Sequence, residues 1–351
     1  MKKKDLKSLP RNELIHLFKE EGYPGFRAKQ VFNWIYKNGV EEFDNMTNLP
    51  EKLQSELQEN AYLTNLTLKD VFTSEDGTSK YLWSLDDCES VESVYLPFLK
   101  VGRHSVCISS QAGCALDCKF CATGSSGLTR NLTTGEIVDQ VFQIQKYISQ
   151  LEFGEPRISN VVFMGMGEPL ANYNSVLKAV DIFNDESGFD IGMRRITIST
   201  AGLVPQIRKL ADENLQIVLA ISLNAPNNYL RSSLMPINEK YPLEKLIDAV
   251  KYYIEKTNRR VTFEYVLIDE LNDSEELALE LSKLLKGLLC HVNLIPLNPI
   301  TDFNFKRPSN ITVNNFRDIL ERNGIETTIR QERGTGIEAA CGQLRHLKSQ
   351  R

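Results

Sequence analysis

The sequence predicts an α/β fold with a parallel sheet covered by helices, preceded by a small N-terminal helical domain and a short antiparallel extension. The main observation is that apolar, β-branched runs alternate six times with segments of helical periodicity after about residue 100, which is typical of βα units. Before residue 100 the pattern differs, with helical periodicity first and short alternating runs afterwards. Periodicity alone fits both an incomplete barrel and an open doubly wound sheet.

The composition is that of a globular chain, because 42% of its 351 residues are hydrophobic and 25% are charged. Lys and Arg number 41 and Asp and Glu 46, so the net charge of −5 does not by itself indicate a nucleic-acid partner. No apolar run reaches the roughly 18 residues of a membrane span. The first residues also lack the continuous apolar stretch of a signal peptide. We therefore expect a cytoplasmic protein with no membrane contact.

Residues 1–60 predict the N-terminal helical domain, because apolar residues recur there every three or four positions. The predicted helices span residues 12–21, 26–38 and 50–59. Residues 61–100 predict the antiparallel extension, since apolar residues alternate in short runs and Glu75-Asp76-Gly77 is typical of a hairpin turn.

Residues 101–345 predict the core of βα units. Thr133 and Glu136 have the spacing of a capping box at the start of its first helix. The predicted strands span residues 105–110, 160–164, 195–200, 217–223, 261–268 and 291–296. The predicted helices span residues 134–150, 174–184, 205–213, 241–257, 274–287 and 312–322.

Three of the seven cysteines, Cys114, Cys118 and Cys121, stand close together in the loop after the first core strand. An odd number of cysteines in a reducing compartment argues for metal ligation or thiol chemistry rather than a disulfide framework. Three thiolates at this spacing can ligate three irons of a [4Fe–4S] cluster and leave the fourth iron open to a substrate. The alternative is a zinc site with His104 or His291 as fourth ligand, although structural zinc usually uses two Cys-x-x-Cys pairs.

Other candidate residues follow the predicted strands, at the end of the sheet where barrel folds carry their chemistry. After the second strand, Gly167 allows close approach to the backbone and Glu168 can accept a hydrogen bond from an ammonium group. The further candidates end the third, fourth and sixth strands: Ser199, Ser222, Leu223, Asn224 and Asn298. One such residue alone is ordinary turn polarity, but their common register favours a binding site.

The cysteine loop, with Phe120 before its last cysteine, resembles the radical S-adenosylmethionine (SAM) superfamily, and nearly the whole chain resembles its RlmN/Cfr family of RNA adenosine methyltransferases. The segments that carry the resemblance are residues 27–30, 91–97, 107–114, 130–133, 164–169, 234–238, 292–299 and 339–344. One departure is Asn224, where the family usually has His. Asn can still hydrogen-bond a ribose hydroxyl or a carboxylate.

The resemblance implies a partial (β/α)6 radical SAM barrel with one [4Fe–4S] cluster on Cys114, Cys118 and Cys121. In this family SAM binds the open iron, and an electron from a flavodoxin- or ferredoxin-type donor cleaves it to a 5′-deoxyadenosyl radical. The implied SAM-binding residues are Gly167, Glu168, Ser199, Ser222, Leu223, Asn224 and Asn298.

The resemblance also implies that each turnover uses two SAM molecules. Cys341 first takes a methyl group from one SAM, and the radical from the second then abstracts a hydrogen from it. The methylene radical adds to an adenine carbon, Glu92 acts as general base, and Cys107 resolves the adduct through a transient Cys107–Cys341 disulfide. The glycines around Cys341 predict a mobile loop that swings toward the barrel mouth.

The implied product is 2-methyladenosine in 23S rRNA and, beside the anticodon, in some tRNAs. The alternative within the family is C8 methylation, the Cfr activity that gives antibiotic resistance; the segment 164–169 favours C2. Alternatives of other classes are a zinc-dependent hydrolase and an iron–sulfur RNA-binding or redox-sensing module. Local basic residues are expected to contact phosphates: Lys119, Arg130, Arg194, Arg195, Arg259, Arg260, Lys306, Arg307 and the tail from Arg330 to Arg351.

Overall fold

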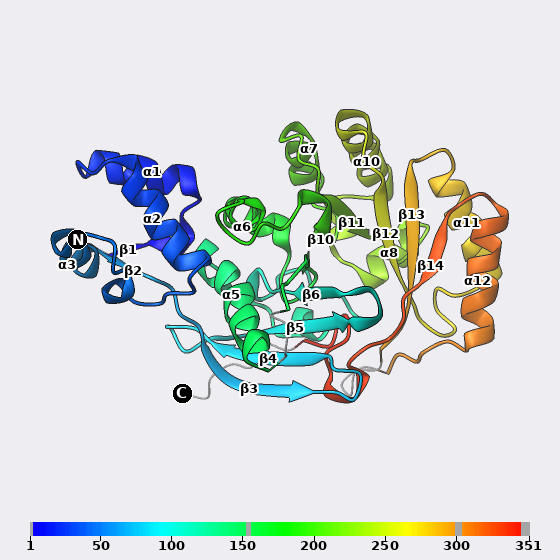
Figure 1. Ribbon diagram of the computed structural model, residues 1–351. Coiled ribbons are helices and arrows are strands. Elements are labelled where there is room, and N and C mark those ends of the chain that lie inside the picture. The colour runs from blue at the N-terminus through cyan, green and yellow to red at the C-terminus, as the bar shows by residue number, and fades with distance from the viewer. Residues whose placement is uncertain (1–2, 152–155, 299–303, 345–351) are drawn as a thin grey trace.

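The computed structural model in Figure 1 describes residues 3–151, 156–298 and 304–344. Within these residues, a ten-stranded sheet has the order β14-β13-β12-β11-β10-β9-β6-β5-β4-β3. The strands from β6 to β14 are parallel, and β3, β4 and β5 continue the sheet in antiparallel fashion. The predicted α/β fold is confirmed. Of the predicted features, Pro299 and the tail after residue 344 lie outside the described residues.

The six predicted core strands are all present, and a seventh parallel strand was missed because it has only three residues. The parallel strands are β6 (Arg103–Cys107), β9 (Asn160–Phe163), β10 (Ile196–Thr200), β11 (Val218–Ser222), β12 (Val261–Leu267), β13 (Cys290–Pro296) and β14 (Thr327–Ile329). Their inward residues are apolar and buried, as in strands covered on both faces. Their carboxyl ends surround the mouth of an incomplete barrel, which resolves the choice left open by periodicity.

The covering helices pack along the outer side of the curved sheet (Figure 1). They are α5 (Thr134–Leu151), α6 (Tyr173–Asn184), α7 (Val204–Asp212), α10 (Leu243–Thr257), α11 (Glu275–Leu285) and α12 (Asn310–Arg322). The capping box at α5 forms in both directions. Thr133 Oγ1 accepts from the Glu136 N–H at 3.2 Å, and Glu136 Oε2 accepts from the Thr133 N–H at 2.8 Å.

Shorter elements that the sequence did not predict lie around the barrel mouth and near the N-terminus. They are α4 (Ala122–Ser125), α8 (Asn228–Leu234), α9 (Ile237–Lys240), the pair β7 (Gln111–Gly113) and β8 (Leu128–Asn131), and the pair β1 (Lys4–Asp5) and β2 (Ala61–Tyr62). The β7–β8 pair frames the cysteine loop, because Cys114 N donates to Gly127 O at 2.9 Å directly after it.

The antiparallel extension consists of β3 (Thr67–Thr73), β4 (Ser79–Ser84) and β5 (Ser90–Phe98). The hairpin turn falls where it was predicted, with the Gly77 N–H donating to Ser74 O at 3.0 Å. β5 pairs with β6, opposing Val94 to Cys107, so one sheet runs from the extension into the barrel. The domain boundaries at residues 60 and 100 stay predictions.

The N-terminal unit contains the three predicted helices α1 (Arg11–Glu20), α2 (Gly25–Tyr36) and α3 (Glu51–Asn60), which lie beside the barrel at the left of Figure 1. Their apolar residues, such as Leu14, Phe18, Val31 and Phe32, are buried. No helix within the described residues is both long and apolar enough to cross a membrane.

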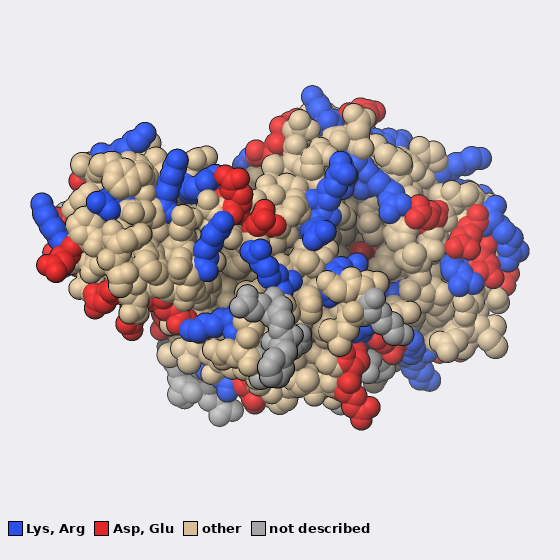
Figure 2. Space-filling view, viewed as in Figure 1, with Lys and Arg blue, Asp and Glu red and all other residues tan. Residues whose placement is uncertain are grey.

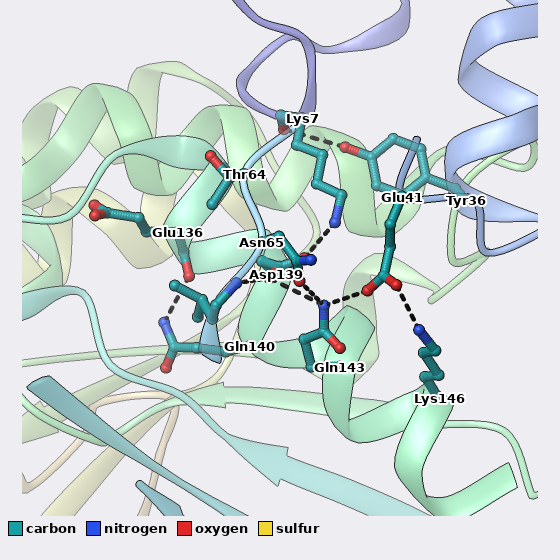
Figure 3. A network of polar contacts seen from close by, with 12 residues as sticks. Lys7, Tyr36, Glu41, Thr64, Asn65, Glu136, Asp139, Gln140, Gln143 and Lys146 are labelled. Atoms are coloured by element: carbon teal, nitrogen blue, oxygen red, sulfur yellow. Dashed lines mark hydrogen bonds and ion pairs between the residues drawn. The ribbon is translucent and has the colours of Figure 1, made fainter. Parts of the chain in front are cut away.

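A buried polar network joins this unit to α5 (Figure 3). Lys7 Nζ lies 2.5 Å from Asp139 Oδ1, and both side chains are fully buried. Asp139 Oδ2 accepts from the Leu66 N–H at 2.6 Å, and the Tyr36 hydroxyl donates to Lys7 O at 3.1 Å. At the rim of the network, Lys146 forms an ion pair with Glu41 at 2.5 Å. These mutual contacts offset the cost of burying two charges and hold the N-terminal unit on the barrel.

Candidate active site

Two adjoining cavities open at the carboxyl ends of the parallel strands. We call the one lined by Cys114, Cys118 and Cys121 the first cavity, and the one lined by Cys107 the second cavity. Six residues line both and form the junction between them: Met164, Ile295, Asn298, Arg330, Cys341 and Leu344. The position is the one expected for chemistry in a parallel barrel.

The cysteine loop presents its three thiols to the first cavity. Backbone hydrogen bonds fix its shape, since Cys121 N donates to Cys118 O at 3.1 Å and Lys119 N donates to Leu234 O at 2.9 Å. Burial raises the pKa of Cys114 to about 12 and that of Cys118 well above its usual value. Because the thiolate is the form that ligates metals, a cationic partner is needed to hold these sulfurs deprotonated at neutral pH.

The two histidines considered as zinc ligands make other contacts. His104 Nδ1 lies 2.6 Å from the Tyr95 hydroxyl, and His291 Nε2 lies 3.1 Å from Thr328 Oγ1. Both histidines stand near the beginning of their strands, whereas the cysteine loop follows the end of β6. In the part of the chain that the structure describes, no three His, Cys, Asp or Glu side chains are placed so as to hold a single metal ion.

Gly167 and Glu168 line the first cavity after β9. Gly167 has φ +95°, and a Cβ there would lie 2.5 Å from Gln111 Cβ, so the neighbouring Gln111 already requires glycine at this position. Glu168 is buried, and its two oxygens accept from the Leu170 N–H at 3.0 Å and the Ala201 N–H at 2.8 Å. Burial raises the pKa of Glu168 to about 7. The Thr200 side chain also hydrogen-bonds this carboxylate, whose two oxygens offer four lone pairs, so one stays available to accept from an ammonium group.

Ser199, Ser222 and Asn224 also line the first cavity. Asn224 has φ 61°, in the left-handed region that Asn tolerates better than most residues. Its Oδ1 accepts from the Val266 N–H at 2.9 Å and its Nδ2 lies 3.2 Å from Met235 Sδ. This residue therefore has a structural role in the wall, in addition to any contact with a ligand.

Asn298 supplies the clearest unfilled polar position at the junction. The residue is buried, its Nδ2 donates weakly to Cys341 O at 3.4 Å, and its Oδ1 has no hydrogen-bond partner among the described residues. A buried oxygen of this kind is costly unless a ligand donates to it. Together with the three thiols and Glu168, it fits a cofactor that brings a metal centre and hydrogen-bond donors into the first cavity.

Leu223 differs from the other candidates, because its side chain is fully buried in the hydrophobic core. Its carbonyl oxygen accepts from Arg231 Nε at 3.1 Å. Arg231 is completely buried and also donates to Ala201 O at 2.6 Å, so it holds together the segments after β10 and β11. Burial lowers the pKa of Arg231 to about 10, which still leaves it charged at neutral pH.

Cys341 lies at the junction of the two cavities, and Cys107 lines the second. The segment around Cys341 is anchored to the cysteine loop: Ala122 N donates to Gly342 O at 2.8 Å, and Thr123 Oγ1 donates to Leu344 O at 2.7 Å. These contacts hold Cys341 at the barrel mouth. The swing expected from the glycines of this loop stays a prediction. Although Cys341 lies late in the sequence, the fold brings it next to both the cysteine loop and Cys107.

Glu92 is buried on β5 and is not among the residues that line either cavity in the described part of the chain. Its carboxylate forms an ion pair with Lys80 at 3.2 Å, and Lys80 also lies 3.4 Å from Glu338 O on the segment that carries Cys341. The structure therefore connects Glu92 to this segment through Lys80.

Two charged residues that line the first cavity were missed as site residues. Glu264, on β12, lines the first cavity and its Oε2 accepts from Asn293 Nδ2 at 2.7 Å. Arg330 lines both cavities, although its place at the start of the basic tail suggested a phosphate contact. A charged residue within an apolar strand was the available signal for Glu264. Arg330 follows a three-residue strand that the sequence did not predict, so it offered no comparable signal.

Several of the described basic residues expected to contact phosphates are paired with carboxylates. Arg130 binds Glu136 through both guanidinium nitrogens at 2.8 Å. Ion pairs also join Lys119 to Asp117, Arg260 to Glu326 and Arg307 to Glu332. Arg194 and Arg195 are exposed. On the face of the molecule seen in Figure 2, a hollow lies near the middle, with Lys and Arg side chains around it.

A curved parallel sheet whose strand ends surround a Cys-x-x-x-Cys-x-x-Cys loop defines a radical SAM protein. Comparison with protein families agrees: the radical SAM superfamily model matches residues 108–281, and the model of the ribosomal RNA large subunit methyltransferase N-terminal domain matches residues 4–63. The chain belongs to the RlmN family of radical SAM RNA methyltransferases. Membership implies a [4Fe–4S] cluster and SAM as cofactors.

The relatives match over nearly their whole length. The chain is 49% identical over 354 residues to a probable dual-specificity RNA methyltransferase RlmN of Alkaliphilus oremlandii, covering 99% of this chain and 100% of the relative. It is 50% identical to the protein of that name from Clostridium novyi, covering 91% of each. A crystal structure of a radical SAM methyltransferase from Sphaerobacter thermophilus superimposes with a TM-score of 0.91 at 47% identity, covering 97% of this chain and 99% of that chain.

Proposed function

We propose that this chain methylates C2 of an adenosine in 23S rRNA and of the adenosine beside the anticodon in some tRNAs. The reaction runs through S-methylated Cys341 and a transient Cys107–Cys341 disulfide. The relatives' name, dual-specificity RNA methyltransferase, supports two kinds of RNA substrate. The observation that carries the mechanism is that Cys341 lines both the cavity of the three cluster cysteines and the cavity of Cys107.

The residues of the first cavity fit SAM and a cluster. Cys114, Cys118 and Cys121 would ligate the cluster, Glu168 would accept from the amino group of SAM, and Asn298 would use its unpaired Oδ1. Gly167, Ser199, Ser222 and Asn224 complete the wall, while Leu223 supports it from the core. When bound, the reduced cluster and SAM supply the 5′-deoxyadenosyl radical.

Cys341 is the methyl carrier in this proposal. An electron-poor adenine C2 cannot displace a methyl group from a sulfonium, whereas a thiolate is a strong nucleophile. Cys341 therefore accepts a methyl group by displacement, gives up a hydrogen from it, and adds the resulting methylene to the adenine carbon. The adenine must leave its stack to reach the barrel mouth, as in other enzymes that modify bases.

Glu92 and Cys107 complete the reaction by releasing the product. Glu92 removes the ring proton, for which its carboxylate must turn away from Lys80; the Lys80 contact to Glu338 O keeps the pair next to the segment of Cys341. The unpaired electron of the adduct must also leave, and the bound cluster would supply the acceptor. The Cys107 thiolate then forms a bond to the Cys341 sulfur, the bond from that sulfur to the methylene carbon breaks, and its electron pair leaves on the base, which takes up a proton to complete the methyl group. A reductant opens this disulfide before the next turnover.

The experiment is an anaerobic assay with reconstituted protein, SAM and a flavodoxin or ferredoxin reducing system. Unmodified 23S rRNA and tRNA are tested separately, and digested nucleosides are compared by mass spectrometry with 2-methyladenosine and 8-methyladenosine. We expect 2-methyladenosine from both RNAs. The 8-methyl isomer would overturn the C2 assignment, and cleavage of SAM without methylated RNA would overturn the substrate.

A further inference from the structure

The side chain of Arg330 reaches across the barrel mouth. Arg330 directly follows β14, and its N–H donates to Leu294 O on β13 at 2.8 Å. Its Nη1 lies 3.8 Å from Met164 Sδ, just after β9, although β9 and β14 are not neighbours in the sheet. The guanidinium is thereby fixed at the junction, where it lines both cavities.

Three groups that carry or can carry negative charge line these cavities together with Arg330: Glu264 in the first, Cys107 in the second, and Cys341 in both. Their charges raise the pKa of Arg330, and Cys341 contributes most. Burial raises the pKa of Cys107 to about 12, and the charge of Arg330 acts in the opposite direction. Burial likewise raises the pKa of Glu264, against Arg330 and the hydrogen bond from Asn293.

The other charged groups near the junction of the two cavities have partners of their own. Glu332 pairs with Arg307, Arg333 Nη1 donates to Pro97 O at 2.9 Å, Lys80 pairs with Glu92, and Glu168 holds two backbone N–H groups. The cluster cysteines line the first cavity. Among the described residues, Arg330 is thus the cation that both reactive thiols share.

We propose that Arg330 is a positioning residue that stabilises negative charge on Cys341 and then on Cys107, and that Glu264 competes with the sulfurs for its charge. The inference rests on the proposed function, because it concerns the same two thiols. Cys341 first loses its proton to water. The sulfur lone pair then forms a bond to the methyl carbon of SAM, the sulfonium carbon–sulfur bond breaks, and its electron pair leaves on S-adenosylhomocysteine.

This arrangement suits a nucleophile that is charged only before it reacts. A guanidinium donates directional hydrogen bonds and stays protonated, so it can hold a thiolate without becoming its proton donor. Once Cys341 is a neutral thioether, the same cation is free to act on Cys107, which needs its thiolate form for the disulfide step.

The test is alkylation of the reconstituted, anaerobic holoprotein by iodoacetamide over a range of pH, without SAM or RNA. Peptide mass spectrometry follows only the unmethylated fraction of Cys341. We expect alkylation of Cys341 near neutral pH to be about tenfold slower in Arg330→Gln. A tenfold smaller thiolate population is the change that lowering the pH by one unit would produce. Arg330→Lys should keep most of the rate, and Glu264→Gln should increase it. Cys290, buried at the start of β13, is the internal control.

Superimposable pH profiles for Arg330→Gln and the parent protein would overturn the inference. If Cys341 and Cys290 are both alkylated faster in Arg330→Gln, the fold of that variant is loosened, and Glu264→Gln then decides. In Glu264→Gln, faster alkylation of Cys341 with an unchanged rate at Cys290 supports the inference. An unchanged rate at Cys341 overturns it. A separate incubation of the parent protein with SAM tests the proposed function. No S-methylated Cys341 peptide there would overturn the methyl-carrier role and leave the alkylation result intact.

Discussion

Lys7 and Arg330 are both basic side chains among groups of low exposure, but they meet different partners. Lys7 Nζ contacts Asp139 at 2.5 Å (Figure 3). It also lies over the Phe142 ring, 3.9 Å from its centroid. The second oxygen of Asp139 is taken up by the Leu66 N–H. Arg330 instead shares its two cavities with the Cys341 and Cys107 thiols, the Met164 thioether and the Glu264 carboxylate.

The Lys7–Asp139 pair therefore stabilises the structure, whereas Arg330 is a cation that stays available for the reaction. In the Lys7–Asp139 pair each charge is neutralised by the other, and neither changes during turnover. At the junction, by contrast, the sulfurs gain and lose charge while Arg330 keeps its own. Substitutions in the first region should therefore change stability, and those in the second should change reactivity.

The largest effect is expected from Cys341→Ala. Methylation of RNA should fall at least about a thousandfold, because the methyl carrier is lost and no side reaction replaces it. The midpoint of unfolding should stay close to that of the parent, since Cys341 is half-buried in a loop. Product formation is measured by mass spectrometry, with Cys88→Ala, an exposed cysteine, as matched control. Retained turnover in Cys341→Ala would contradict the mechanism.

Asp139→Asn should lower the free energy of unfolding by about 3–5 kcal/mol, because it leaves the Lys7 ammonium buried without a counter-charge. Urea unfolding curves measure the loss. The matched control is Lys178→Ala, which removes an exposed ion pair of 2.6 Å between Glu13 on α1 and Lys178 on α6. Its cost should stay below about 1 kcal/mol. Equal losses would mean that the buried pair has no special role.

The double variant Lys7→Met/Asp139→Asn should regain stability, to within about 2 kcal/mol of the parent. The thioether side chain introduced in place of Lys7 fills the same buried space without a charge. The amide introduced in place of the Asp139 carboxylate keeps an oxygen that accepts from the Leu66 N–H. The same urea curves give the coupling between the two sites. If the double variant is no more stable than Asp139→Asn, the unpaired charge was not the cause of the loss.

The smallest effect concerns pH. Since the pKa of Cys107 is raised to about 12, its alkylation by iodoacetamide at mildly alkaline pH should be slow and should rise about tenfold per pH unit. The exposed Cys88 provides the comparison in the same peptide map. The raised folded-state value also means that the contribution of Cys107 to stability is complete below about pH 9 and is lost as pH rises toward 12. Rapid alkylation of Cys107 near neutral pH would contradict the stated burial.

Much of the fold could be predicted because the core strands are long apolar runs between clear helical segments. The strand Thr327–Ile329 escaped detection, since three residues carry no periodicity. The joining of the extension to the barrel sheet was also missed, because strand pairing between Val94 and Cys107 is set by tertiary packing rather than by either local sequence.

The site was predictable wherever polar residues end parallel strands, as Ser199 and Asn298 do. Leu223 belongs to the core rather than to the cavity wall, because it continues the extended chain directly after Ser222, where successive side chains point to opposite faces. Arg231 and Arg330 could not be assigned from sequence, since their roles depend on carbonyl groups and thiols that come from distant parts of the chain.

The continuous ten-stranded sheet also affects how the protein avoids aggregation through an exposed strand edge. Without β5, the buried strand β6 would end the sheet and offer unpaired backbone groups beside apolar side chains. The extension moves this edge outward to β3, which is mostly exposed, carries Lys69 and Asp70, and has an irregular register between Leu68 and Asp70. Charge and irregularity make such a strand a poor template for a foreign one, so the extension protects the barrel against aggregation.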